Sequence, residues 1–152
     1  MNMYVQLVHE KAKMPTRAHY NDAGLDVFTP VDVTINPGEK VMINTGIKWV
    51  IPDGWVAIIK DKSGLSCNFD LTTRAGVIDA GYRGEVVIKL HNEGTEPFKF
   101  KAGEKISQVL AQAFLNVHCH FLYKLQQVFH MAQNSIFFVL EVLLPPLSVK
   151  LH

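Results

Sequence analysis

The sequence predicts an all-β domain over residues 1–115, followed by a tail of different composition. Short runs rich in β-branched and aromatic residues recur at close spacing, and most of them are too short to be helices. Turn-forming residues separate these runs, as at Asn36-Pro37-Gly38 and Pro52-Asp53-Gly54. Val31, Val33 and Ile35 alternate with polar residues, which is typical of a strand with one buried face.

Each expected strand is a β-rich run bounded by turn residues. In chain order they are Tyr4 to Val8, Val31 to Ile35, Lys40 to Asn44, Ile47 to Ile51, Trp55 to Lys60, Glu85 to His91 and Lys105 to Ala113. The spacing is that of an antiparallel sandwich or barrel.

The tail, residues 116–152, differs from the domain in composition. It contains no glycine and no arginine, and it carries a dense apolar run from Ile136 to Leu147. Leu125, Val128, Phe129 and Ala132 lie at helical spacing and predict one short helix. We expect the apolar run to pack against the domain, because an exposed apolar patch of that size promotes association.

Composition limits the classes of function. A chain of 152 residues with a formal net charge of +1 and no run of lysine or arginine is not typical of a nucleic-acid groove. It contains no segment resembling a signal peptide or a membrane span. It has only two cysteines, Cys67 and Cys119, and we expect both to be reduced thiols. We therefore expect a soluble intracellular protein, in the cytoplasm or nucleus of a cell or encoded by a virus, without nucleic-acid or membrane partners.

The segment from Gly76 to Glu85 holds the densest group of polar residues and leads directly into an expected strand. Asp79 stands in it between glycines and apolar residues. On a rigid hairpin with restricted hydration, such a carboxylate could orient and deprotonate a water molecule. An aspartate that only caps its own turn is the alternative interpretation.

Two other segments offer groups that suit phosphate. Lys62-Ser63-Gly64 supplies a cation, a hydroxyl and a backbone N–H that an oxyanion can approach closely, although an ordinary loop would have the same residues. Gln108 is an amide among apolar neighbours in an expected strand. Because buried amides need hydrogen-bond partners, it belongs to a polar network or contacts a ligand.

The segment from Asp22 to Val27 carries two carboxylates, Asp22 and Asp26, beside apolar residues. Mg²⁺ keeps much of its hydration shell and needs few protein carboxylates, so these two acids could face a hydrated Mg²⁺. Taken alone, the segment also suits a simple turn.

Together and in this order, the four segments resemble the motifs of the dUTPase family over residues 4–115. The matching segments are Ala23-Gly24-Leu25-Asp26-Val27, Lys62-Ser63-Gly64-Leu65, Gly76-Val77-Ile78-Asp79 with Gly81-Tyr82-Arg83-Gly84-Glu85, and Gly103-Glu104-Lys105-Ile106 with Gln108. The resemblance implies a jelly-roll-like β barrel that assembles as a homotrimer with shared active sites. It also implies hydrolysis of dUTP to dUMP and pyrophosphate with Mg²⁺ as cofactor.

The resemblance also implies a role for individual residues. Asp79 would activate the attacking water, and Tyr82 would lie under the deoxyribose and exclude a 2′-hydroxyl. Asp26 would hold Mg²⁺ through water. The phosphate-contacting positions would be Lys62, Ser63, Gly64 and Gln108, and the uracil-reading hairpin would be the backbone around Gly76, Val77, Ile78 and Val87.

Two departures from the family pattern bear on activity. The second motif usually begins Pro-Arg, and here Asp61 and Lys62 stand at those positions. Lysine keeps the positive charge but cannot form the bidentate hydrogen bonds that arginine makes with phosphate oxygens. Asp61 adds a negative charge near the phosphates. The family's terminal Arg- and Gly-rich lid is missing, since no arginine follows Arg83 and no glycine follows Gly103. We expect reduced turnover as a result.

Two rival functions follow from these features. A dUTP-binding or regulatory module without turnover is favoured by the missing lid, whereas Asp26, Asp79 and Tyr82 favour catalysis. The dCTP deaminase branch shares a similar third motif but carries a glutamate as proton shuttle in the next strand, where this chain has Lys89. Lysine cannot take that role at neutral pH without a large shift of its pKa, so the deaminase is the weaker rival.

Overall fold

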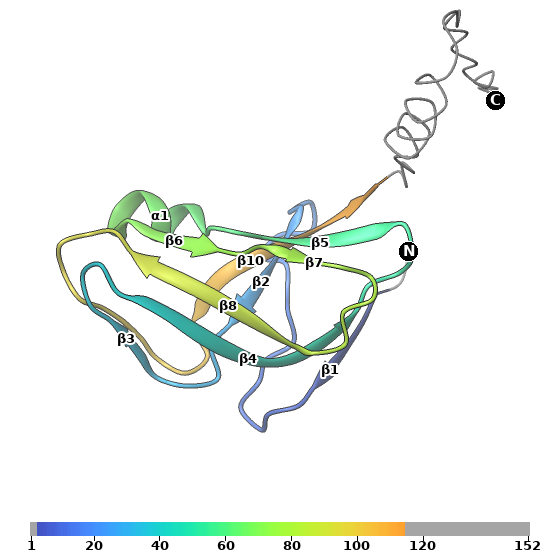
Figure 1. The fold of residues 1–152 in the computed structure, drawn as a ribbon, viewed down its shortest axis with the longest axis horizontal. Helices are drawn as coiled ribbons and strands as arrows, with labels where there is room; N and C mark the ends of the chain where they lie inside the picture. The colour runs from blue at the N-terminus through green and yellow to red at the C-terminus, as the bar shows by residue number, and fades with distance from the viewer. Residues whose placement is uncertain (1–2, 115–152) are drawn as a thin grey trace, which may run out of the picture. The chain divides into compact units, whose positions relative to one another are not determined.

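Two four-stranded antiparallel sheets and a two-stranded ribbon make up residues 3–114, the part of the chain that the computed structural model describes (Figure 1). The elements are β1 (Tyr4–Leu7), β2 (Gly24–Phe28), β3 (Val33–Ile35), β4 (Lys40–Val50), β5 (Trp55–Lys60), α1 (Ser63–Phe69), β6 (Leu71–Arg74), β7 (Val77–Ile78), β8 (Glu85–Asn92), β9 (Phe98–Phe100) and β10 (Lys105–Ala113). The prediction of an all-β fold is confirmed. Within these residues no helix is long and apolar enough to cross a membrane.

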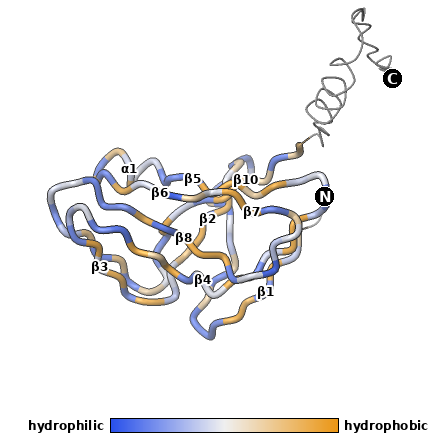
Figure 2. Tube along the Cα trace, in the orientation of Figure 1, coloured by the Kyte–Doolittle hydropathy of each residue, from blue (hydrophilic) through white to orange (hydrophobic). Residues whose placement is uncertain are grey.

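The strand order is β1-β4-β8-β6 in one sheet and β2-β10-β5-β7 in the other, and β3 pairs with β9. Inner residues of both sheets form one apolar core. Trp49, Ile88 and Leu90 from the first sheet and Ile59 and Val109 from the second are all buried in it. Along β8 every second residue is buried, and hydrophobic and hydrophilic residues are interspersed along the strands in Figure 2. The core therefore fixes which face of each sheet points outward.

Strand β4 corrects the sequence prediction, which placed separate strands on either side of residues 45 and 46. The strand continues through them, and its register against β8 shifts between Asn44 and Lys48. Gly46 has a φ of +72°, which a glycine adopts without strain. The Glu85 carboxylate accepts a hydrogen bond from the Gly46 N–H at 2.7 Å. A bulge therefore stands where the sequence predicted a break between two strands.

Helix α1 and strands β2, β6, β7 and β9 were not among the elements expected from the sequence. Helix α1 has seven residues, no side-chain cap at its start and no buried residue. It ends at Asp70, whose φ is +52°. Strands β6 and β9 have only four and three residues. Elements this short carry too little local pattern to be predicted. The short strands form because neighbouring strands supply their hydrogen bonds.

The boundary between domain and tail stays a prediction. The tail over residues 116–152, its expected helix and its apolar run lie outside the described residues.

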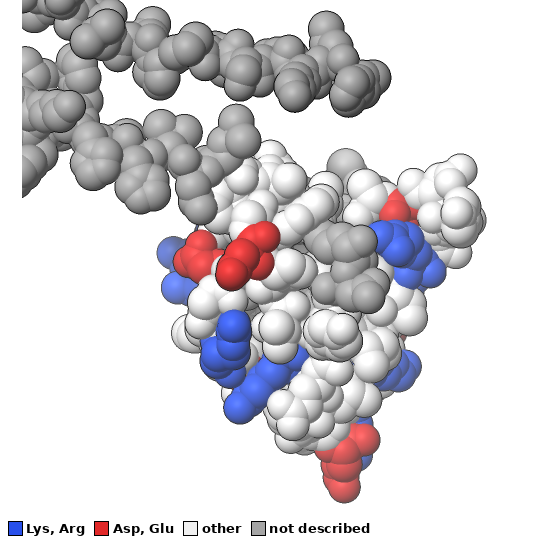
Figure 3. Space-filling model, turned by 90° about the vertical axis from the view of Figure 1, so that its right-hand side faces the viewer, with Lys and Arg blue, Asp and Glu red and all other residues white. Residues whose placement is uncertain are grey.

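On the face shown in Figure 3, basic and acidic side chains stand in small groups with uncharged surface between them.

Candidate functional site

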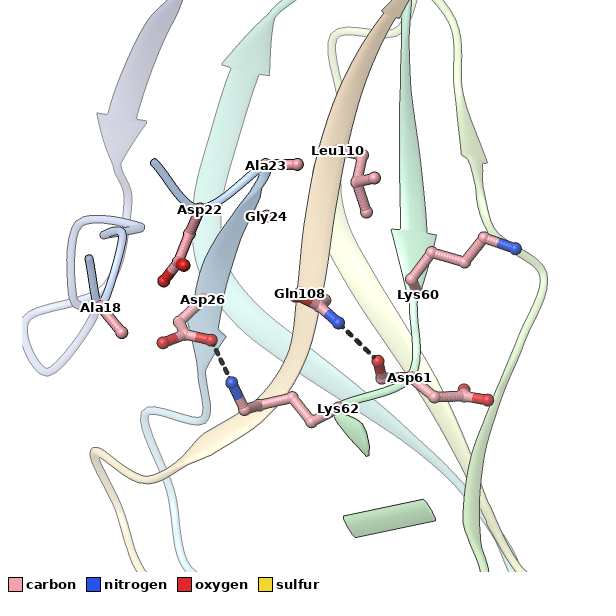
Figure 4. Close-up of a pocket in the computed structure, with 10 residues that line it drawn as sticks. All are labelled: Ala18, Asp22, Ala23, Gly24, Asp26, Lys60, Asp61, Lys62, Gln108 and Leu110. Atoms are coloured by element: carbon pink, nitrogen blue, oxygen red, sulfur yellow. Dashed lines mark hydrogen bonds and ion pairs between the residues drawn. The ribbon is translucent and has the colours of Figure 1, made fainter. Parts of the chain in front are cut away.

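A pocket of about 560 Å³ lies where β2, β10 and the end of β5 meet (Figure 4). Strand β10 runs between the other two, and Gln108 stands opposite Asp26 on one side and Lys60 on the other. Three segments that are far apart in sequence thus meet as cross-strand neighbours. Lys62, two residues beyond β5, completes the charged part of the lining.

Asp26 is the electrostatic centre of this pocket, although it is only 4% exposed. Lys62 Nζ donates a hydrogen bond to its Oδ1 at 2.5 Å. Lys105 Nζ lies 2.7 Å from Oδ2, as an ion pair that lacks hydrogen-bond geometry. Burial alone would raise the pKa of Asp26, but the contacts and charges of Lys105 and Lys62 outweigh it and hold the pKa below its usual value. The cluster carries one negative and two positive charges, which favours binding of a further anion.

The lowered pKa of Asp26 leads to a prediction about stability. A depressed folded-state pKa means that the ionised carboxylate stabilises the fold above pH 3.8 and that this contribution is lost as the pH falls through the folded-state pKa. At about pH 7, Asp26→Asn should lower the free energy of unfolding by about 1–3 kcal/mol. Between about pH 5 and pH 3 the gap from wild type should shrink. Urea unfolding across this range measures it, with Asp53→Asn at an exposed turn as the control. A gap that stays constant down to pH 3 would contradict it.

Gln108 belongs to a polar network at the floor of the pocket. Its Nε2 donates a hydrogen bond to the Asp61 carbonyl oxygen at 2.8 Å. On the other side Gly24 leaves room for it, since a Cβ there would lie 2.3 Å from Gln108 Oε1. The amide is therefore held in one orientation, with its oxygen toward β2 and its nitrogen toward the end of β5. The Asp61 carboxylate points away from this pocket (Figure 4).

Ser63 and Gly64 stand in the first turn of α1, directly after Lys62, and both are exposed. A Cβ at Gly64 would meet no atom within 4 Å, so packing inside the chain does not require a glycine there. The open space above Gly64 leaves its backbone accessible to a ligand or to another chain.

A second group of predicted site residues lies on the hairpin from β7 to β8. Asp79 is exposed in the turn, and its carbonyl accepts a hydrogen bond from the Tyr82 N–H at 3.0 Å. The Tyr82 hydroxyl donates to the Glu85 carbonyl at 2.8 Å. A Cβ on Gly84 would lie 2.7 Å from Cζ of Tyr82. Glycine at this position thus lets the aromatic ring lie close over the backbone.

The predicted uracil-reading positions frame the same hairpin. Val77 is 68% exposed, whereas the side chain of Ile78 is buried in the core, which leaves only its backbone for a ligand. Gly76 packs against β5, where a Cβ would lie 2.9 Å from the Ile59 carbonyl oxygen. Val87 is half-buried on β8. The hairpin therefore presents backbone groups on a rigid support.

The two groups do not line one pocket within a single chain. Ile78 pairs with Ala57, and Gln108 pairs with Lys60, three residues further along β5. This spacing amounts to about 10 Å along a strand, and the chain direction takes Asp79 still further from Lys60. Figure 1 shows the turn after β7 at the opposite end of the sheets from α1. A complete site would need the second group from another copy of the chain.

Sequence reasoning missed two lysines, one paired with Asp26 and one lining the pocket. Lys105 contributes the second cation beside Asp26, and Lys60 lines the pocket from β5. Both were placed in strands correctly, but only the pairing of β10 with β2 and β5 brings them to the site. A lysine at the start of a strand following a Gly-Glu turn was the available signal for Lys105, and it is a weak one.

The chain is similar to known proteins of one family. Residues 10–135 match the family described as dUTPase. Deoxyuridine 5′-triphosphate nucleotidohydrolase of Clostridium tetani is 41% identical over 116 residues, which cover 75% of this chain and 80% of that protein. The enzyme of the same name from Clostridium novyi is 40% identical over 119 residues, covering 77% and 84%.

Solved structures give a similar result. A dUTPase from phage phi11 of Staphylococcus aureus, solved with a structural Mg(II) ion, superposes with a TM-score of 0.74 at 27% identity, covering 78% of this chain and 94% of the other. The dUTPase of Staphylococcus bacteriophage 80alpha in complex with dUpNHpp superposes with a TM-score of 0.73 at 26% identity, covering 77% and 93%.

Proposed function

The chain belongs to the dUTPase family, and on that premise we propose that its two groups of site residues are complementary halves of one active site. The protein is a dUTP diphosphatase, which converts dUTP and water to dUMP and pyrophosphate. The proposed site rests on the meeting of Asp26, Lys62 and Gln108 in one pocket. A rigid hairpin that bears Asp79 and Tyr82 lies apart from this pocket in the same chain.

The chemistry requires one base and several phosphate contacts. Asp79 takes a proton from a water molecule as the water oxygen bonds to the α-phosphorus, and the bond from that phosphorus to the bridging oxygen breaks to release pyrophosphate. Phosphoryl transfer depends mainly on positioning and charge neutralisation, so no covalent intermediate with the protein is needed. In the free chain Asp79 is exposed, and packing against a neighbouring copy would restrict its hydration.

Lys62, Ser63, Gly64 and Gln108 contact the phosphates in this proposal. Lys62 is bonded to Asp26, so its ammonium is held at the pocket rather than free in solvent. Holding it there lowers the entropic cost of forming a phosphate contact. Lys105, on the other side of Asp26, adds a second positive charge to attract the polyanion.

The residues of the pocket suit Mg²⁺ held through water. Among residues 3–114 no three His, Cys, Asp or Glu side chains stand close enough to bind a metal directly. The buried Asp26 Oδ2 lacks a hydrogen-bond donor in good geometry, and Asp22 lines the same pocket. A hydrated ion bound to substrate phosphates could donate from its waters to Asp26. When bound, Mg²⁺ would neutralise charge on the phosphates, and Asp26 would orient its water shell.

The separation of the two groups supports sites shared between copies of the chain. The resemblance to the family implies that the copies form a homotrimer. We expect light scattering to give about three times the chain mass of 17.1 kDa at micromolar concentration. Mixing inactive Asp79→Asn with inactive Lys62→Met protein, after subunit exchange, should restore part of the activity, because some sites then combine two intact halves. A monomeric mass, or mixtures that stay inactive after exchange, would contradict shared sites.

A pyrophosphate-release assay with dUTP and Mg²⁺, run beside a dUTP-binding titration, tests the proposed function. Release of pyrophosphate is expected, and the rate measures how far turnover is reduced. Tight binding without release would instead support the non-catalytic module. The deaminase is disfavoured because Lys89 stands opposite Met42 and Arg74 on the outer face of its sheet, where the deaminase pattern has glutamate.

A further inference from the structure

We infer that Asp61 is a positioning residue: its carboxylate fastens the phosphate-facing end of β5 to β6, and its carbonyl orients Gln108. This inference rests on the proposed function of the pocket. It gives Asp61 the opposite effect from the one its charge suggests, since a carboxylate near the phosphates would by itself weaken their binding.

The Asp61 side chain is held by two donors from one residue. Its Oδ1 accepts hydrogen bonds from the Thr73 N–H at 2.5 Å and from the Thr73 hydroxyl at 2.6 Å. Hydrogen bonds to an ionised acceptor are short and are about twice as strong as neutral ones. Asp61 and Thr73 are both half-buried, so these bonds are only partly exposed to competition from water.

This contact joins the two sheets of the domain. Thr73 lies on β6, the edge strand of the sheet β1-β4-β8-β6, and Asp61 directly follows β5 in the other sheet. The outer side of an edge strand has no ladder partner for its backbone groups. Asp61 supplies that partner for the Thr73 N–H. The end of β5 is thereby tied to a fixed point of the opposite sheet.

The same residue also acts on the pocket. Its carbonyl oxygen accepts the hydrogen bond from Gln108 Nε2 at 2.8 Å, and its neighbour Lys62 reaches Asp26. Figure 4 shows the Asp61 carboxylate pointing to the side away from Asp26 and Lys62. Asp61 is thus bonded to β6 through its side chain and to β10 through its carbonyl. The phosphate-binding Lys62 is the next residue in the sequence.

Among residues 3–114, the Asp61 carboxylate supplies the hydrogen bonds that tie this link to β6. Residues 61 and 62 belong to neither β5 nor α1. Helix α1, which follows at Ser63, has no side-chain cap and no fully buried residue, and it contacts the core through the partly buried Leu65. Without the Asp61 carboxylate the link would move more freely, and both the Gln108 amide and the Lys62 ammonium would lose part of their fixed placement.

The test compares Asp61→Ala with Asp61→Asn. Both variants remove the negative charge, but asparagine keeps an oxygen that can accept from Thr73. We expect Asp61→Ala to raise both KM for dUTP and the Kd for a non-hydrolysable imido analogue of dUTP about tenfold, the scale of a lost hydrogen bond to a charged group, with a smaller effect on kcat. Asp61→Asn should stay within about threefold of wild type. Alanine binding as tightly as wild type or tighter, or equal effects of the two variants, would overturn the inference.

A second pair of variants keeps the test decisive if Asp61→Ala does not fold. Thr73→Val removes the hydroxyl donor, whereas Thr73→Ser retains it. Valine should weaken analogue binding about threefold and serine should not. Equal binding by the two would overturn the role of the contact.

Hydrogen exchange of the Thr73 amide, read by NMR without nucleotide, should be faster in Asp61→Ala and near wild type in Asp61→Asn. If wild type bound the analogue but released no pyrophosphate, the proposed function would fail while the exchange result stood. If the wild type were active and Asp61→Ala changed neither the exchange of the Thr73 amide nor analogue binding, only the inference about Asp61 would be wrong.

Discussion

Asp79→Asn is expected to lower kcat for dUTP by about a thousandfold, within the range that a general base contributes. The change removes the proton acceptor and nearly conserves side-chain volume. The hydrogen bond that fixes the turn joins the Tyr82 N–H to the Asp79 carbonyl, so it does not depend on the carboxylate. The Kd for the imido analogue of dUTP should therefore change little. Steady-state pyrophosphate release and calorimetric titration measure the two quantities.

Asp53→Asn provides the matched control for this prediction. Asp53, like Asp79, is an exposed turn aspartate; it lies in the connection before β5 and belongs to neither group of site residues. Its replacement should leave kcat within about twofold of wild type. If Asp79→Asn retained full turnover, the base would have to be another group, and the hairpin would serve only to bind nucleotide.

Discrimination between dUTP and UTP is the second large effect expected, with kcat/KM favouring dUTP by about a hundredfold or more. Tyr82 is the residue that should impose it, because its ring lies close over Gly84 and its hydroxyl is tied to the Glu85 carbonyl. A ring held at both points cannot move aside for a 2′-hydroxyl. Tyr82→Ala should lower the preference by at least about tenfold, chiefly by improving the use of UTP.

Tyr82→Phe separates the ring from its anchoring bond. It keeps the steric block but loses the hydrogen bond to Glu85, so the preference for dUTP should fall by only a few-fold. Competition assays with both nucleotides in one reaction measure the ratio directly. Equal use of dUTP and UTP by the wild-type protein would remove Tyr82 from this role.

The sequence by itself determined the fold class and much of the candidate site's chemistry. Strands β5 and β10 were predicted with their observed bounds, because their residues are local β-formers between clear turns. Asp26, Lys62 and Gln108 were singled out because a carboxylate, a cation and an amide stand out among apolar neighbours and fit a family pattern. Such signals are contained in a few adjacent residues.

Tertiary structure alone decided how these residues are combined. Strand pairing brought Lys105 to Asp26 and made one bulged strand of β4. It also directed the Asp61 carboxylate to Thr73, across 12 positions of sequence, and placed Asp79 away from the phosphate pocket. The physical reason is that register and cross-strand contacts depend on how distant segments share one core. Local sequence decides whether a strand forms, whereas the fold decides which side chains it meets.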